Sequence, residues 1–85
     1  GGITGAFLES AAMISLIGAM ATPKLPKTIN ITIEYLRPGR AVDTYATGIV
    51  TKQGRRVANV RAHAWQQDRN KLIATASTHF LMADA

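Results

Sequence analysis

Cysteine is absent from this sequence of 85 residues. Its absence excludes disulfide bonds and thiolate metal sites, and it makes the reducing cytoplasm the expected location. Charge is also scarce in residues 1–23, where Glu9 is the one charged side chain. The 14 uncharged residues between Glu9 and Lys24 are too few to cross a bilayer, which needs about 20. No basic segment precedes them, as a secretory signal would require, so we expect a buried helix in a soluble protein.

Positive charge exceeds negative charge over the whole chain. Ten Lys and Arg residues against five Asp and Glu residues give a net charge of +5. A basic surface suits a polyanionic partner, either nucleic acid or a phosphorylated small molecule. A chain of 85 residues forms one domain, and so small a domain buries a low fraction of its surface. Self-association is therefore expected.

Residues 3–20 are predicted to form a helix. The polar side chains of this segment are Thr4, Glu9, Ser10 and Ser15. A helix with so few polar residues is apolar on all sides, and we expect protein to surround it. Thr22, Pro23 and Pro26 mark its end.

After Pro26 the hydrophobic period changes to two, which predicts four strands in an antiparallel meander. The first strand should bury Ile29, Ile31, Ile33 and Tyr35. The second covers residues 42–52 and ends in a tight turn at Gln53-Gly54. The third, over residues 57–67, should bury Ala58, Val60, Ala62 and Ala64. The fourth, over residues 72–82, should bury Leu72, Ala74, Ala76, Phe80 and Met82.

The predicted fold class is therefore α+β, with one long helix and a curved antiparallel sheet wrapped around it. Such a helix can be enclosed only if the sheet curls around it. One sheet cannot cover every side, so we expect a partner subunit or a further segment of chain to cover the rest.

Three segments together resemble one family. The stretch Gly1–Ala11 combines a glycine pair, a helix and an acidic residue, Ile33–Gly39 follows as a strand, and Lys52–Ala58 carries a Gly-Arg hairpin. In this order they resemble the hotdog-fold acyl-CoA thioesterases, in the branch of the phenylacetate-pathway and 4-hydroxybenzoyl-CoA thioesterases. The likeness covers residues 1–85 as a single hotdog domain.

The resemblance implies a hydrolase that converts an acyl-CoA thioester to a free acid and CoA. Family members form dimers whose sheets join edge to edge, with two active sites at the interface, so a homodimer or homotetramer is expected. Members usually carry a His or Asn before the glycine pair, and a strand and a helix before that. We therefore expect the native chain to begin upstream of Gly1.

Glu9 is the expected catalytic carboxylate. It lies seven residues beyond Gly2, about two helical turns, and so on the same side of the helix. The resemblance implies that it acts as general base for water or as nucleophile, and both roles stay open. Backbone N–H groups of Gly1 and Gly2, at the positive end of the helix, would bind the oxyanion. Alternatively, Glu9 is a first-turn acid favoured by the helix dipole or one partner of a buried ion pair.

Thr28 opens the first strand, where related enzymes often place a hydroxyl residue that reaches the partner subunit's site. A solvated threonine at a strand start would explain it equally well. His63 and His79 have no acid at metal-ligand spacing, and we expect both at the surface or at an interface. No metal or redox cofactor is expected.

A basic hairpin tip is the expected binding site for the phosphates of CoA, which enters as part of the substrate. It consists of Lys52, Gly54, Arg55 and Arg56. Arginine suits bidentate contact with phosphate, although a solvated turn kept soluble by charge is the alternative. Arg37 and Arg40 are further candidates of the same kind.

Two other functions stay open. A hotdog-fold dehydratase acting on acyl-CoA or acyl-carrier protein would pair a His with the acid, and no His is near Glu9 in the sequence. A non-catalytic module could bind acyl-CoA as a regulator, attached to a DNA-binding segment, because basic charge alone does not distinguish CoA from nucleic acid. The resemblance favours the thioesterase, and CoA over nucleic acid.

Overall fold

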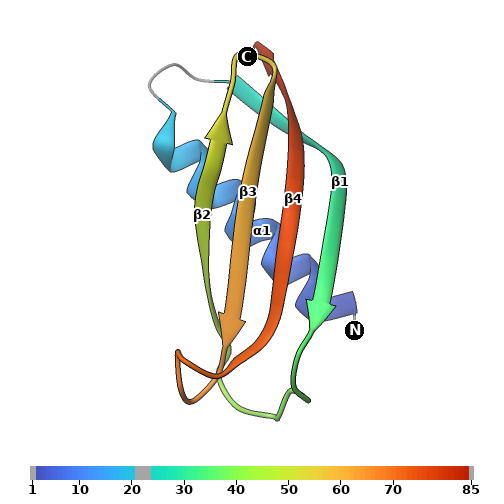
Figure 1. Ribbon diagram of the computed structural model, residues 1–85, viewed down its shortest axis with the longest axis vertical. Helices are drawn as coiled ribbons and strands as arrows, with labels where there is room; N and C mark the ends of the chain where they lie inside the picture. Colours follow the sequence, from blue (N-terminus) through green and yellow to red (C-terminus); the bar gives the residue numbers. More distant parts are fainter. Residues whose placement is uncertain (1, 21–23, 85) are drawn as a thin grey trace.

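The computed structural model describes residues 2–20 and 24–84, which form one helix and four strands (Figure 1). The helix is α1 (Gly2–Ala19), and the strands are β1 (Lys24–Tyr35), β2 (Tyr45–Gln53), β3 (Val57–Trp65) and β4 (Leu72–Asp84). The strands make one curved antiparallel sheet, and α1 crosses one face of it obliquely. The predicted α+β class is confirmed. Across these residues, no helix combines the length and hydropathy needed to span a membrane.

The strand order in the sheet is β1-β4-β3-β2, so the prediction of a meander of four strands is wrong. β2, β3 and β4 are consecutive neighbours, but β1 pairs with β4. Residues 36–44 carry the chain from β1 to β2 past the ends of the two strands between them (Figure 1). The backbone N–H groups of Leu36 and Arg37 donate to the carbonyl of Ile73, at 2.8 and 3.2 Å. These bonds hold the beginning of the connection against the start of β4.

Small side chains let α1 lie close to the sheet. Leu8, Ala12 and Leu16, four residues apart, form the buried stripe of α1. The predicted inner face of β3 is confirmed, because Ala58, Val60, Ala62 and Ala64 are all buried. On β2, a Cβ atom added at Gly48 would lie 2.5 Å from Ser15 Oγ and 3.1 Å from the Ala11 carbonyl oxygen. The helix therefore touches the backbone of β2 at this point.

The inner face of β4 matches the prediction at Ala74, Ala76, Phe80 and Met82, which are buried. Leu72 is only half-buried, whereas its neighbour Ile73 is buried. The cause is a register shift, since Ala64 pairs with Ala74 but Trp65 pairs with Leu72. Thr78 is buried as well, and its hydroxyl has no hydrogen-bond partner in the part of the chain that the structure describes.

A bulge at Ile29 changes which residues of β1 face the helix. Thr28 pairs with Phe80 and Asn30 pairs with His79, so Ile29 has no partner in the ladder. Ile31 and Ile33 pack against the core as predicted, but Ile29 is 57% exposed and Tyr35 54%, so burial of these two was wrong. Because Thr28 lies opposite the buried Phe80, its half-buried side chain is on the helix side of the sheet.

The side of α1 turned away from the sheet is open. Ile14 is 70% exposed, Ile17 51% and Phe7 40%. Within residues 2–20 and 24–84, the four strands cover only one stripe of α1, as expected of a single sheet. An exposed apolar face of this kind marks an interaction surface. Its cover by a partner or a further segment stays a prediction.

Gly48→Ala is expected to lower the free energy of unfolding by about 1–3 kcal/mol, because the added methyl group would push α1 and β2 apart. Gly18→Ala is the matched control, since nothing lies within 4 Å of a Cβ atom at that helical position. Alanine should raise stability there by up to ~1 kcal/mol. Urea denaturation measures the free energy of unfolding of both variants. Equal free energies of unfolding for Gly48→Ala and Gly18→Ala would contradict the close packing at Gly48.

Candidate active site

Glu9 lies near the middle of α1 and is half-buried. Gly5, one turn earlier, faces β1, because a Cβ atom added there would lie 2.9 Å from Ile33 Cδ1. Glu9 therefore lies on the flank of the helix nearest β1. Within the described residues it makes no hydrogen bond or ion pair. It also lies beyond the first turn, so it is not a first-turn acid of α1.

Gly2 is the first residue of α1, and Gly1 lies outside the described residues. The first N–H groups of a helix have no partner within it and form its positive end. Thr4, in this first turn, lines a hollow of about 390 Å³ together with residues 35–39 and Ile73. The start of α1 is therefore beside a cavity, although Glu9 is not part of its lining.

Gly2 and Glu9 are on one side of the helix but at different heights. Seven residues at a rise of 1.5 Å each separate them by about 10 Å along the axis. An acid and an oxyanion donor that act on one carbonyl group must each reach it within about 3 Å. The backbones of Gly2 and Glu9 in one chain are therefore about two helical turns apart.

Thr28 is not brought close to the start of α1. It lies in the half of β1 that follows Lys24, whereas the helix begins near the other end of that strand, at Tyr35 (Figure 1). The side chain of Thr28 is on the side of the sheet that α1 covers, and α1 carries Glu9. The two residues come from different regions of this face.

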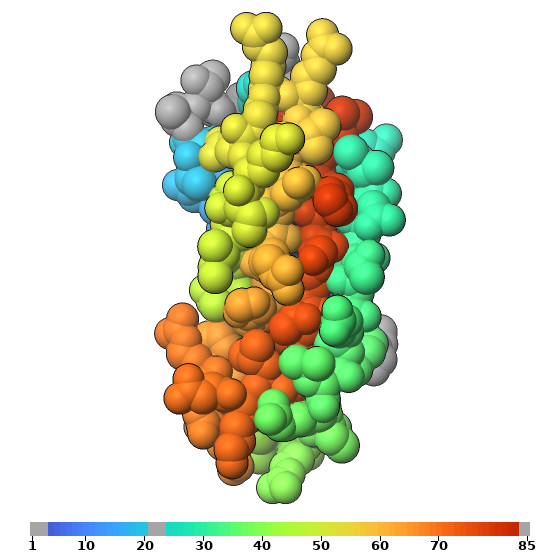
Figure 2. All heavy atoms as spheres, in the orientation of Figure 1, coloured from blue at the N-terminus to red at the C-terminus, as the bar shows by residue number. Residues whose placement is uncertain are grey.

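The predicted basic hairpin forms the turn between β2 and β3. The Gly54 N–H donates to the Val57 carbonyl, at 2.9 Å, and the exposed side chains of Lys52, Arg55 and Arg56 surround this turn. Side chains of the turn project beyond the end of the sheet (Figure 2). Sequence reasoning missed Lys24, whose Nζ donates to the Arg55 carbonyl at 2.8 Å.

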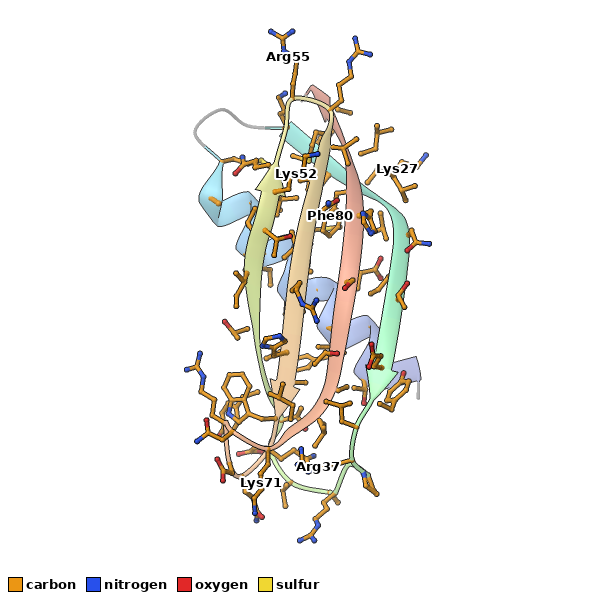
Figure 3. All side chains as sticks on the ribbon, in the orientation of Figure 1. Lys27, Arg37, Lys52, Arg55, Lys71 and Phe80 are labelled. Atoms are coloured by element: carbon orange, nitrogen blue, oxygen red, sulfur yellow. The ribbon has the colours of Figure 1, made fainter. Side chains whose placement is uncertain are left out.

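The hairpin is at the opposite end of the molecule from the start of α1 (Figure 1). Lys24, Arg55 and Arg56 line a hollow of about 460 Å³ there. At the helix-start end the cations are Arg37, Arg40 and Lys71, around a second hollow of about 360 Å³. Figure 3 shows the labelled Lys52 and Arg55 at one end and Arg37 and Lys71 at the other. Lys71 was also missed, because only the fold brings it to Arg37.

Both histidines lie on the sheet face turned away from α1. His63 pairs across the sheet with Thr47 and Thr75, and His79 Nδ1 is 2.8 Å from Asn59 Oδ1. The described segments hold no group of three His, Cys, Asp or Glu side chains that could bind a metal ion. This position on the far face separates both imidazoles from Glu9.

A sequence profile described as the thioesterase superfamily matches residues 1–73. The chain belongs to the thioesterase superfamily. Comparison with curated proteins gave no match. The superfamily membership and the hotdog fold predicted from the sequence are both confirmed.

Solved structures of similar proteins share this thioesterase fold. A protein from Chromobacterium violaceum is 47% identical over 98% of this chain and 61% of its own, with a TM-score of 0.83. A phenylacetic acid degradation-related protein from Ralstonia eutropha is 27% identical over 95% and 60%, with a TM-score of 0.86. A protein from Bacillus halodurans, solved with CoA, has a TM-score of 0.89 at 21% identity, over 100% and 56%. The chain thus spans between 56% and 61% of the length of these three structures.

Proposed function

We propose that this chain is the catalytic domain of an acyl-CoA thioesterase, which hydrolyses an acyl-CoA thioester to a free acid and CoA. The observation that carries the proposal is Glu9, a half-buried carboxylate with no partner among the described residues, in a chain of the thioesterase superfamily. Burying a carboxylate costs free energy unless it is paired or used, so the partial burial of Glu9 without a partner among the described residues favours a functional role. The CoA in the Bacillus halodurans structure supports CoA as the thiol.

The chemistry requires a base or nucleophile and a donor for the oxyanion. Glu9 takes a proton from water as the water oxygen attacks the thioester carbon, or the carboxylate attacks that carbon itself. The N–H of Gly2 or Gly1 stabilises the negative charge on the carbonyl oxygen. The carbon–sulfur bond then breaks, and CoA leaves as a thiolate that takes up a proton. Where Glu9 is the nucleophile, this step leaves an acyl group on its carboxylate as a mixed anhydride, and water then hydrolyses the anhydride to release the free acid and restore the carboxylate. CoA enters as part of the substrate, so no separate cofactor takes part.

The two groups that act on one thioester come from two chains in this proposal. The spacing of about 10 Å between their backbones along α1 supports this, because within one helix only the length of the Glu9 side chain could close the gap to a carbonyl group held at Gly2. A second helix running in the opposite direction would place its Gly2 beside this Glu9. The active enzyme is then a homodimer, or a homotetramer made of two dimers. Thr28 and the hairpin cations Lys52, Arg55 and Arg56, with Gly54 at the turn, are proposed to contact the substrate, the cations through its phosphates.

A dehydratase receives no support from this geometry. That chemistry needs a histidine beside the carboxylate, and His63 and His79 lie on the other face of the sheet from α1. Location in the cytoplasm, expected from the lack of cysteine, stays a prediction.

Glu9→Gln is expected to lower the rate of thiol release from acyl-CoA by roughly a hundredfold or more, because amide nitrogen and oxygen cannot replace a positioned base. Glu34→Gln is the matched control, since Glu34 is an exposed carboxylate on β1. The rate of thiol release by both variants is measured with a thiol reagent over a panel of acyl-CoA substrates. Equal rates for wild type and Glu9→Gln would remove Glu9 from the proposed mechanism.

Subunit complementation tests whether the active site uses two chains. Gly2→Pro removes one N–H from the helix start without opposing the helix, and Gly2→Ala keeps that N–H as the control. Equal amounts of Glu9→Gln and Gly2→Pro chains, refolded together, should recover about a quarter of the wild-type rate. Half of the dimers are then mixed, and one of their two sites has both groups intact. Mixtures no more active than the separate variants would place both groups in one chain.

The open face of α1 is expected to be buried in the proposed dimer or tetramer. A double variant, Ile14→Glu with Ile17→Glu, should shift the protein to monomers, because two carboxylates would be buried without partners. Leu81→Glu is the control, since Leu81 is also exposed but lies on β4, an interior strand of the sheet, away from this face. Analytical ultracentrifugation measures the masses. An unchanged mass for the double variant would exclude this helix face from the interface.

A further inference from the structure

A cationic hollow lies at the helix-start end of the molecule. It has a volume of about 360 Å³ and lies between the connection after β1 and the turn before β4. Arg37 and Arg40 line it from the connection, and Lys71 lines it from the turn. The volume is within the range of small-molecule sites, about 300–1,000 Å³. We refer to it as the Arg40 hollow.

Hydrogen bonds fix both walls of the Arg40 hollow. Gln66 Nε2 donates to the Arg40 carbonyl at 2.8 Å, and the Arg40 N–H donates to Gln66 Oε1 at 3.0 Å. This pair of bonds clamps the connection to the end of β3. On the other wall, the Lys71 N–H donates to the Asp68 carbonyl at 2.9 Å, which closes the turn. The backbone that carries the cations is therefore held in place without a ligand.

The positive charge of the hollow is not neutralised within the described residues. Arg37, Arg40 and Lys71 against the single carboxylate of Asp68 leave a formal charge of +2. Asp68 Oδ1 accepts the Asn70 N–H at 2.8 Å, and no ion pair joins Asp68 to these cations. Arg37 uses one N–H to bind the Leu72 carbonyl, at 2.8 Å, which leaves four of its five donors.

We infer that the Arg40 hollow binds a phosphate group, as a second anion site at the opposite end of the molecule from the hairpin. A phosphate monoester carries nearly two negative charges at neutral pH, which matches the formal charge of the hollow. Two guanidinium groups offer bidentate contacts, and the ammonium group of Lys71 adds a point charge. Arg69, in the same turn, lies 4.8 Å over the Trp65 ring and does not line the hollow.

Two phosphate sources fit this chemistry. The hollow shares Arg37, Pro38 and Ile73 with the cavity beside Thr4, so the nucleotide end of a CoA thioester bound near the helix start could reach it. A free nucleotide or inorganic phosphate compound is the other source. Only the first source rests on the proposed function.

NMR titration of the protein with inorganic pyrophosphate tests the site. Saturable shifts are expected for the Arg40 and Lys71 backbone amides and for the Gln66 side-chain amide. The dissociation constant from these signals should rise at least tenfold in the double variant Arg40→Gln with Lys71→Gln. It should change less than about twofold in Arg55→Gln with Arg56→Gln, which removes the same charge from the hairpin, and high salt should weaken binding.

The inference is overturned if these three signals do not shift, or if the two double variants weaken binding equally. Titration with CoA and with ADP then separates the sources. CoA that shifts the same signals assigns the phosphate to the thioester substrate, whereas ADP that binds where CoA does not assigns a free nucleotide. A protein that binds pyrophosphate here but hydrolyses no thioester would remove the proposed function and leave this site standing.

Discussion

Close contact between α1 and the sheet depends on very small residues, alanine and glycine, at the points where the two meet. Alanines of β3 and β4 lie under the helix. Gly48 lacks the Cβ atom that would meet α1 from β2, and Gly5 of α1 lacks the Cβ atom that would meet Ile33 of β1. Larger residues at these points would lift α1 from the sheet. The position of α1 in turn sets the position of Glu9 and of the unpaired amides at the helix start. The packing of small residues therefore determines the geometry of the candidate active site.

The composition of α1 also explains why one chain leaves an apolar surface exposed. A four-stranded sheet can bury a single stripe of helix, here Leu8, Ala12 and Leu16, yet the opposite stripe is equally apolar. A helix that is apolar on both sides is typical of a position between two layers. The spacing of Gly2 and Glu9 along α1 supports a site shared between chains.

Sequence periodicity was sufficient to predict the helix, the strand limits to within a few residues, and the inner face of β3. It could not predict that β1 pairs with β4, because alternation reports which face of a strand is buried and not which strand lies beside it. It misplaced Ile29, since one inserted residue reverses the faces of a strand without changing the pattern of residue types. Glu9 could be singled out from the sequence because it is the one acid of an apolar segment. Its expected catalytic role was implied by the family resemblance. Lys71 could not be connected with Arg37, because their proximity depends on the strand order.

Both outer strands of the sheet contain an unpaired residue. The ladder shifts at Ile29 in β1 and at Thr51 in β2, and these two strands form the edges of the sheet. A bulge bends a strand and interrupts the even spacing of its outward N–H and carbonyl groups. A foreign strand that docks along either edge could keep its register on only one side of the interruption. The margins of this sheet therefore resist indefinite growth by strand addition, although each retains a short regular stretch on which one specific partner could pair.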